Sequence, residues 1–359
     1  MIQTQDIAHP RVESKPVKNT KPQRMAKPAG ISPLAFVLEE HSLRGKDIIG
    51  IEHLSAAELH LILHVAAMLK ANKFDETQTL FGKGQTLAML FEKPSLRTRV
   101  TFEAGMTQLG GHAINLEGKL GERESIADVG KNLERWIDGI MARTYEHETV
   151  LALAANAGIP VINGLSNKEH PCQALADFLT LIEHKGNVQK GQADSGQLVP
   201  GLAGVKLAYV GDSNNVSNSL LLAAATLGCD FTIGCPHKYE PQASIWMKAL
   251  ELAKVSGATI TLTNDPHEAV AGADAAYTDV WTSMGQEAES AEREKIFAPY
   301  QLNSSLMASA KSDAIVMHCL PAHRGLEITD DVIDGANSVV FDQAENRLHA
   351  QKAILALVL

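Results

Sequence analysis

Several features that would assign a protein to a class are missing from this 359-residue sequence. No apolar run approaches the roughly 20 residues that a membrane-spanning helix needs. The formal net charge is -10, whereas a nucleic-acid-binding chain has a basic surface. Only four cysteines occur, and their spacing fits no pattern of metal ligands. The composition therefore argues against a membrane protein, a nucleic-acid binder and a zinc domain.

The cysteines also give no support for disulfides. If Cys229 and Cys235 share a strand, the rise of the strand separates them by about 20 Å, which is too far for a disulfide bond. Reduced thiols are usual in the cytosol, so we expect a cytoplasmic protein.

Residues 1–34 lack apolar periodicity and are rich in proline, lysine and glutamine. Such a composition predicts a disordered tail. A targeting peptide is the less favoured alternative. Transit peptides are rich in arginine and poor in acids, whereas this segment is rich in lysine and contains Asp6 and Glu13.

The rest of the chain alternates short apolar runs with amphipathic helical stretches. Its length suggests two domains, and the alternation predicts an α/β fold with two doubly wound parallel sheets. Ser55 and Glu58 have the spacing of a capping box at the start of an early helix. The expected strands are residues 86–91, 112–116, 137–143 and 159–163, followed by 205–212, 231–233, 259–262, 275–279 and 315–321.

Residues 95–99 read Ser-Leu-Arg-Thr-Arg and fall where a strand gives way to a helix, with Ser95 as the expected N-cap. A helix N-terminus offers free N–H groups and a positive dipole end to a phosphate, and Arg97 and Arg99 add charged donors. The alternative is a solvated basic turn, but cations at a helix N-terminus oppose the dipole unless an anion binds. We therefore expect an anion site.

Two further residues stand where ligands bind in parallel sheets. Arg143 is at the carboxyl end of an expected strand. His170 precedes Pro171 and so lies at another turn into a helix. An isolated histidine is more often structural, but this position favours a site. The expected strand 205–212 is not followed by the glycines of a dinucleotide-binding turn, so no nicotinamide cofactor is expected.

Five short motifs together point to one family. They are residues 95–99, 170–173 (His-Pro-Cys-Gln), 212–215 (Asp-Ser-Asn-Asn), 279–285 (Asp-Val-Trp-Thr-Ser-Met-Gly) and 318–321 (His-Cys-Leu-Pro). In this order the motifs resemble those of the aspartate/ornithine carbamoyltransferase family, over about residues 45–359. The last two motifs resemble the ornithine branch of that family.

This resemblance implies that the chain transfers the carbamoyl group of carbamoyl phosphate to the δ-amine of L-ornithine, giving L-citrulline and phosphate. It implies a carbamoyl phosphate-binding domain at residues 35–180 and an ornithine-binding domain at 181–343. A C-terminal helix at 344–359 would return to the first domain. A homotrimer is also implied, and no metal or organic cofactor is needed.

The resemblance also assigns roles to individual residues. Arg143, His170 and Cys319 would be catalytic, with a Cys319 thiolate orienting an uncharged amine. The implied ligands of carbamoyl phosphate are Ser95, Leu96, Arg97, Thr98, Lys119, Arg143, His170, Gln173, Cys319, Leu320 and Arg347. Those of ornithine are Asn215, Asp279, Ser283 and Met284, with Asp279 paired to the α-ammonium.

Two positions depart from the common family pattern. Leu96 stands where many relatives have threonine, and Lys119 where many have glutamine, in a loop that would reach a neighbouring subunit. The open alternatives are a carbamoyltransferase for N-acetylornithine or putrescine, an inactive relative acting as a binding partner, and a dehydrogenase. For Cys319 the alternative is a buried thiol at a strand end.

Overall fold

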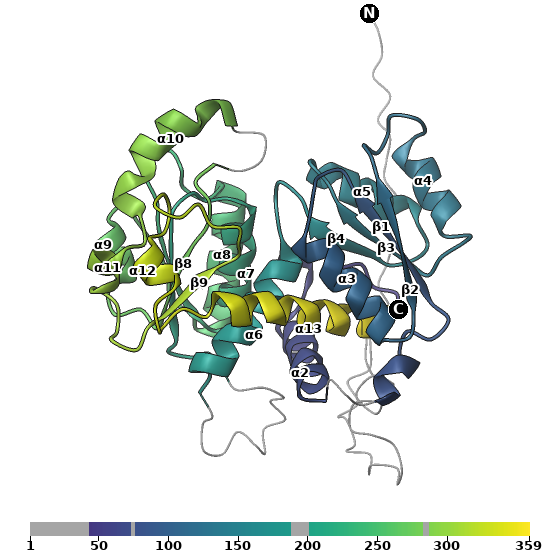
Figure 1. The fold of residues 1–359 in the computed structure, drawn as a ribbon, viewed down its shortest axis with the longest axis horizontal. Helices are drawn as coiled ribbons and strands as arrows, with labels where there is room; N and C mark the ends of the chain where they lie inside the picture. Colours follow the sequence, from purple (N-terminus) through teal and green to yellow (C-terminus); the bar gives the residue numbers. More distant parts are fainter. Residues whose placement is uncertain (1–42, 73–75, 188–200, 283–286) are drawn as a thin grey trace, which may run out of the picture.

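The computed structural model describes residues 43–72, 76–187, 201–282 and 287–359 (Figure 1). The expected tail lies outside these residues, as do Ser283 and Met284. In the described part of the chain, no helix has both the length and the apolarity to cross a membrane.

The first sheet is parallel and has the strand order β2-β1-β3-β4. The chain places β2 on one side of β1 and then crosses to the other side for β3. The strands are β1 (Thr86–Phe91), β2 (His112–Glu117), β3 (Gly139–Arg143) and β4 (Val161–Leu165). The connecting helices are α3 (Arg97–Gln108), α4 (Ile126–Leu133), α5 (His147–Asn156) and α6 (Pro171–Lys185), and η1 (Ile51–His53), α2 (Ala56–Ala71) and η2 (Glu76–Leu80) precede the sheet.

The second sheet is also parallel, with the order β7-β6-β5-β8-β9. Its strands are β5 (Lys206–Val210), β6 (Asp230–Gly234), β7 (Ile260–Thr263), β8 (Ala275–Thr278) and β9 (Ile315–His318). Its helices are α7 (Asn215–Leu227), α8 (Ala243–Ser256), α9 (Pro266–Val270), η4 (Glu287–Glu289), α10 (Ser290–Phe297), η5 (Ala298–Tyr300), α11 (Ser304–Met307) and α12 (Asp330–Ile333). This arrangement confirms the predicted fold class.

Each sheet has one point where the strand order reverses, between β1 and β3 in the first and between β5 and β8 in the second. Ligands of open parallel sheets bind beyond the carboxyl ends of the strands at such a point. The strand ends concerned are Phe91 and Arg143 in one sheet and Val210 and Thr278 in the other. The topology therefore specifies where a site can form.

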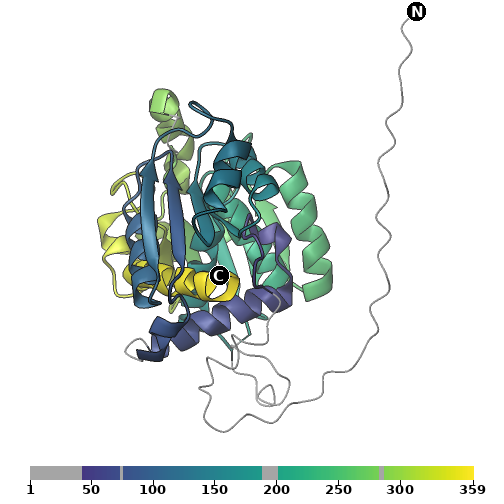
Figure 2. The same ribbon diagram turned by 90° about the vertical axis from the view of Figure 1, so that its right-hand side faces the viewer.

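The last helix, α13 (Val340–Val358), joins the two halves. It contacts β9 of the second sheet as well as α2, α3 and α6, and Figure 1 shows it running from beneath the second sheet to beneath the first. In Figure 2 it lies alongside α2. Both α6 and α13 are buried on nearly all sides, as expected of helices inside a continuous core.

The predicted capping box at the start of α2 is confirmed. The Ser55 Oγ atom accepts a hydrogen bond from the Glu58 N–H at 3.3 Å, and a Glu58 carboxylate oxygen accepts one from the Ser55 N–H at 2.8 Å. Two of the four N–H groups that a helix start leaves unpaired are thereby satisfied.

Replacing Ser55 with alanine removes the oxygen that accepts the Glu58 N–H. We expect Ser55→Ala to lower the free energy of unfolding by about 1 kcal/mol, measured by denaturant titration, without changing activity. Ser55→Thr keeps the acceptor and is the matched control. Equal stability of Ser55→Ala and the wild type would show that the cap contributes nothing.

Candidate active site

A cavity of about 810 Å³ lies between the carboxyl ends of the two sheets. It takes residues from both switch points and from α13, so its two walls belong to different sheets. Of the predicted site residues that the structure describes, all but Lys119 line it. They are Ser95, Leu96, Arg97, Thr98, Arg143, His170, Gln173, Asn215, Asp279, Cys319, Leu320 and Arg347.

The start of α3 forms one end of the cavity. The N-cap is Leu96, not Ser95, so the sequence prediction is wrong by one residue. The physical reason is that the first intrahelical hydrogen bond runs from the Val100 N–H to the Leu96 carbonyl oxygen at 3.0 Å, although the backbone angles of Leu96 (φ −84°, ψ −64°) are themselves helical. A leucine side chain cannot accept a hydrogen bond, and no side chain caps this end. The first-turn N–H groups are left for an external acceptor, which is the arrangement of an anion site.

Three guanidinium groups converge on this end of the cavity. Arg97 donates through Nη2 to the Leu320 carbonyl oxygen at 2.5 Å. Arg347 donates through Nη1 to Gln173 Oε1 at 2.5 Å and through Nη2 to Thr98 Oγ1 at 2.9 Å. The Nε atoms of Arg143 and Arg347 are buried without a hydrogen-bond partner among the described residues.

These three guanidiniums have no acid in direct contact with them among the described residues. Within the described residues, none of the three forms an ion pair with a carboxylate. Burial, and then the charges of Arg347 and Arg97, lower the pKa of Arg143 to about 10. Burial also lowers the pKa of Arg97 and of Arg347. Because buried cations need a counter-charge, this end of the cavity is built for an anion.

His170 lies beside the arginines, immediately before Pro171 opens α6. Its backbone N–H donates to Ser219 Oγ at 2.9 Å, which ties this turn to α7. Burial, together with the charges of Arg347, Arg143 and Arg97, holds the pKa of His170 well below its usual value. The imidazole is therefore neutral at pH 7. Its Nδ1 atom has no partner among the described residues and can bond to a polar ligand.

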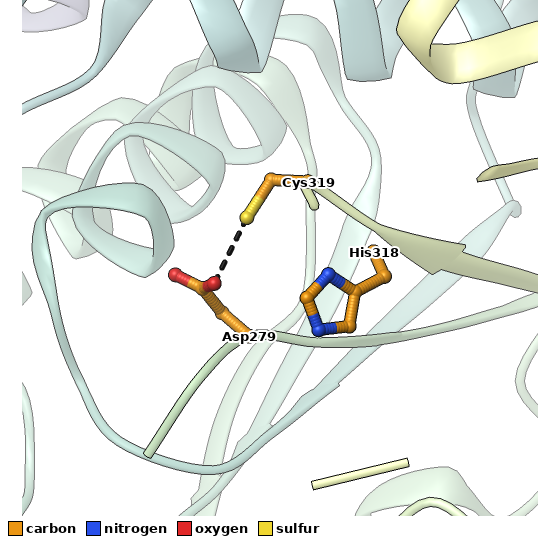
Figure 3. Close-up of side chains that lie close together, drawn as sticks. All are labelled: Asp279, His318 and Cys319. Atoms are coloured by element: carbon orange, nitrogen blue, oxygen red, sulfur yellow. Dashed lines mark hydrogen bonds between the residues drawn. The ribbon is translucent and has the colours of Figure 1, made fainter. Parts of the chain in front are cut away.

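The opposite wall carries Asp279 and Cys319 at the ends of β8 and β9 (Figure 3). The Cys319 Sγ atom lies 2.9 Å from Asp279 Oδ1. Loss of solvent and the adjacent Asp279 carboxylate raise the pKa of the Cys319 thiol well above its usual value. Cys319 is therefore a thiol that donates to Asp279. The predicted thiolate is wrong, because a thiolate would face a carboxylate at hydrogen-bond distance.

Asp279, His318 and Cys319 form the one group of possible metal ligands found among the described residues, with donor atoms within 4.8 Å of one another. The histidine is already engaged on both ring nitrogens. Its Nδ1 atom accepts from the Leu320 N–H at 2.9 Å, and its Nε2 atom lies 3.1 Å from Glu327 Oε1. A metal at His318 would have to replace one of these bonds, so the donor set fits a metal poorly.

Asp279 is 6% exposed and keeps hydrogen bonds to its own neighbourhood. Its Oδ2 atom accepts from Asn214 Nδ2 at 2.7 Å, and its Oδ1 atom from the Val280 N–H at 2.8 Å. Asn214 also caps α7, so the carboxylate is fixed relative to that helix. The predicted Asn215 lies alongside and donates to the Ser166 carbonyl oxygen at 2.6 Å, across to the first sheet.

The cavity wall also holds residues that the sequence analysis did not assign to the site, Lys93 and Arg293 among them. Lys93 is 8% exposed and packs its ammonium 4.4 Å from the centre of the Tyr145 ring. Its position two residues before Ser95 could have indicated that it belongs to the same site. Arg293 in α10 pairs with Asp212 and donates through Nε to the Trp281 carbonyl oxygen at 2.6 Å. No motif surrounds Arg293, so only the fold reveals it.

One predicted residue that the structure describes is not brought into the cavity. Lys119 follows β2, and its side chain is 68% exposed, 3.9 Å from Glu122. Ser283 and Met284 lie outside the described residues.

Two family models match the chain. One is described as the carbamoyl-P binding domain of aspartate/ornithine carbamoyltransferase and matches residues 46–183. The other is described as the Asp/Orn binding domain of the same family and matches residues 203–358.

Individual relatives agree with these matches. The ornithine carbamoyltransferase of Bacillus subtilis is 52% identical over 321 residues, 89% of this chain and 95% of the relative. The anabolic ornithine carbamoyltransferase of Pyrococcus furiosus is 51% identical over 322 residues, 89% of this chain and 98% of the relative. A solved structure of ornithine carbamoyltransferase from Pyrococcus furiosus has a TM-score of 0.81 at 49% identity, and the match covers 89% of this chain and 98% of that chain. The chain belongs to the aspartate/ornithine carbamoyltransferase family.

Proposed function

We propose that this protein transfers the carbamoyl group of carbamoyl phosphate to the δ-amine of L-ornithine, giving L-citrulline and phosphate. The observation that carries the proposal is a trio of guanidiniums that form no ion pair among the described residues and face a wall that holds Asp279; Arg347 is buried, and Arg97 and Arg143 are half-buried. Such a cavity suits an anionic carbamoyl donor at one end and an ammonium group at the other. The family membership and the names of the relatives support the same reaction.

In this proposal the phosphate binds at the start of α3, through the Arg97 and Thr98 side chains and the backbone of Ser95 and Leu96. The departing phosphate takes the electrons of the broken C–O bond and the proton that the attacking amine loses, and the guanidiniums stabilise its charge. Donors held in place before the reaction in this way supply a large part of catalysis. The exposed Leu96 side chain contributes no donor. A leucine where many relatives have threonine therefore leaves the contact through the backbone N–H intact.

Arg143, His170 and Gln173 are proposed to orient the carbamoyl group, with Arg347, Cys319 and the Leu320 backbone completing that part of the pocket. A neutral His170 offers a hydrogen bond without adding a fourth positive charge. The three cations and the oriented donors polarise the carbonyl, which makes its carbon open to attack by an amine lone pair.

Asn215, Asp279, Ser283 and Met284 are proposed to bind ornithine. Asp279 would pair with the α-ammonium, while the Cys319 S–H remains bonded to the same carboxylate. The thiol adds no charge near the δ-amine. The three guanidiniums at the other end of the cavity disfavour a second ammonium there, and so favour the neutral δ-amine that can attack.

We also propose roles for the two domains, an oligomeric state and a cellular location. We assign residues 35–180 and helix 344–359 to carbamoyl phosphate binding, and residues 181–343 to ornithine binding. A homotrimer is supported by exposed apolar side chains on α3 and on the edge strand β2, where Val100 is 53% and Leu116 is 42% exposed. Lys119, in the loop after β2, would then reach a neighbouring site. The four free cysteines support a cytoplasmic location.

The first test removes one cation from the anion end. Arg143→Ala or Arg97→Ala should lower kcat/KM for carbamoyl phosphate by about a hundredfold or more, since each charged hydrogen bond is worth about 1.5–3 kcal/mol. Steady-state citrulline formation measures this. Arg135→Ala, at a surface position outside the cavity, is the matched control. Near-normal kcat/KM for carbamoyl phosphate in either cavity variant would remove that residue from the site.

The second test concerns the choice of amine. Asp279→Asn should raise the KM for ornithine and narrow its preference over putrescine, which has no α-ammonium and no carboxylate. N-acetylornithine should be a poor wild-type substrate, because it leaves the buried Asp279 carboxylate unpaired. The control is Asp274→Asn. Asp274 immediately precedes the first residue of β8, at the end of the strand away from Asp279. Full discrimination between ornithine and putrescine in Asp279→Asn would contradict the role of Asp279.

A further inference from the structure

A buried carboxyl group that the proposed chemistry does not use lies behind the cavity. Asp177 in α6 is 1% exposed and accepts three hydrogen bonds from other side chains. Gln173 Nε2 and Gln343 Nε2 each donate to Asp177 Oδ1 at 2.7 Å. The Tyr277 hydroxyl donates to Asp177 Oδ2 at 3.1 Å. These donors come from α6, α13 and β8, so the carboxyl joins elements that are far apart in the sequence.

On one side, Asp177 controls which way the Gln173 amide points. The Gln173 oxygen accepts from Arg347 Nη1 at 2.5 Å, and its nitrogen donates to Asp177 at 2.7 Å. A flipped amide would place its NH₂ against a guanidinium and its oxygen against a carboxylate, which are two repulsions. Only one orientation of Gln173 therefore satisfies both neighbours. Arg347 in turn donates to Thr98, at the start of α3.

On the other side, the same carboxyl is connected to the strands that carry the amine end of the cavity. Gln343 also accepts, through Oε1, the backbone N–H of His318 at 3.0 Å, immediately before Cys319. Tyr277 stands in β8, two residues before Asp279. The hydrogen bonds of Asp177 thus link side chains that set both walls of the site.

All three hydrogen bonds to Asp177 use its carboxyl oxygens as acceptors, which suits the ionised form. Burial raises the pKa of Asp177 to about 7 although the three donors and the Arg347 charge oppose that rise, so the carboxyl loses its charge as the pH falls through neutrality. The titratable groups that face it are Tyr277 from β8, Arg347 from α13 and Cys319 after β9. Tyr277 and Cys319 have raised pKa values, so neither changes charge near neutral pH.

We propose that Asp177 is a positioning residue for carbamoyl transfer, whose ionised carboxyl orients the Gln173 amide and holds Arg347, β8 and β9 in register around the cavity. This inference rests on the proposed function. It does not require Asp177 to touch either substrate, since Asp177 is absent from the cavity wall.

If Asp177 acts through Gln173, loss of its charge should lower turnover and leave phosphate binding unchanged. Phosphate is bound mainly by the start of α3 with Arg97 and Arg143, which do not contact Asp177. Removing a negative charge behind three guanidiniums does not weaken their attraction for an anion. Turnover depends on the orientation of Gln173, which becomes free to flip when Asp177 loses its charge.

The experiment compares Asp177→Asn with Thr180→Val. Thr180 lies one turn further along α6, is fully buried and accepts a hydrogen bond from Asn346 of α13, so its replacement disturbs the same helix contact. We expect Asp177→Asn to lower kcat about tenfold or more while the Kd for inorganic phosphate stays within about threefold. Thr180→Val should change neither value by more than about twofold.

Two results would overturn the proposal. One is a kcat of Asp177→Asn within about twofold of the wild type. The other is a proportional loss of kcat and phosphate affinity, as general loosening of the fold would give. A wild-type protein that forms no citrulline would instead refute the proposed function, so the two failures are distinguishable.

A second variant decides the matter if Asp177→Asn does not fold. Tyr277→Phe keeps the ring that stacks on Tyr209 at 5.8 Å but removes one donor to the carboxylate. Loss of a donor raises the pKa of Asp177, so the acid limb of the kcat–pH profile should move to higher pH than in the wild type. Ionisation of ornithine is the same in the assays of both proteins, so it cannot cause a difference between their kcat–pH profiles. An unchanged limb would contradict the proposal.

Discussion

The constraint on which the site depends is a set of three guanidiniums, one buried and two half-buried, that form no ion pair with a carboxylate among the described residues. Arg97, Arg143 and Arg347 come from α3, β3 and α13, and the fold brings their charges to one end of one cavity. Keeping like charges together in a buried place costs stability, and an anion that enters offsets this cost. Burial and the arginine charges keep His170 neutral, and burial and the Asp279 carboxylate keep Cys319 protonated.

The topology explains why those residues meet. Each parallel sheet reverses its strand order once, and the two reversals face each other across the cavity. α13 then crosses from the second sheet to the first and contributes Arg347 to the anion end. A helix that contacts both halves also fixes the distance between the anion end and Asp279, which is the span that the two substrates have to fill together.

Much of this arrangement could be predicted from the sequence, because the residues concerned stand next to local signals. Arg143 ends a recognisable strand, and the capping box of Ser55 is complete within four residues. Local signals did not locate the exact start of α3. Its N-cap is Leu96 and not the expected Ser95. They also failed for Asp177 and Arg293, whose partners are up to 166 positions away, so that only folding shows the contact. The charge state of Cys319 needed the position of Asp279, 40 residues earlier in the chain.

The central claim is that the unpaired guanidiniums and the start of α3 form the site of the transferred group's phosphate. A crystal structure of the protein soaked with carbamoyl phosphate, or with inorganic phosphate, tests this most directly. The account predicts a phosphate bonded to first-turn N–H groups of α3 and to at least two of the guanidiniums of Arg97, Arg143 and Arg347. A phosphate bound elsewhere in the cavity, away from α3 and those three side chains, would contradict it.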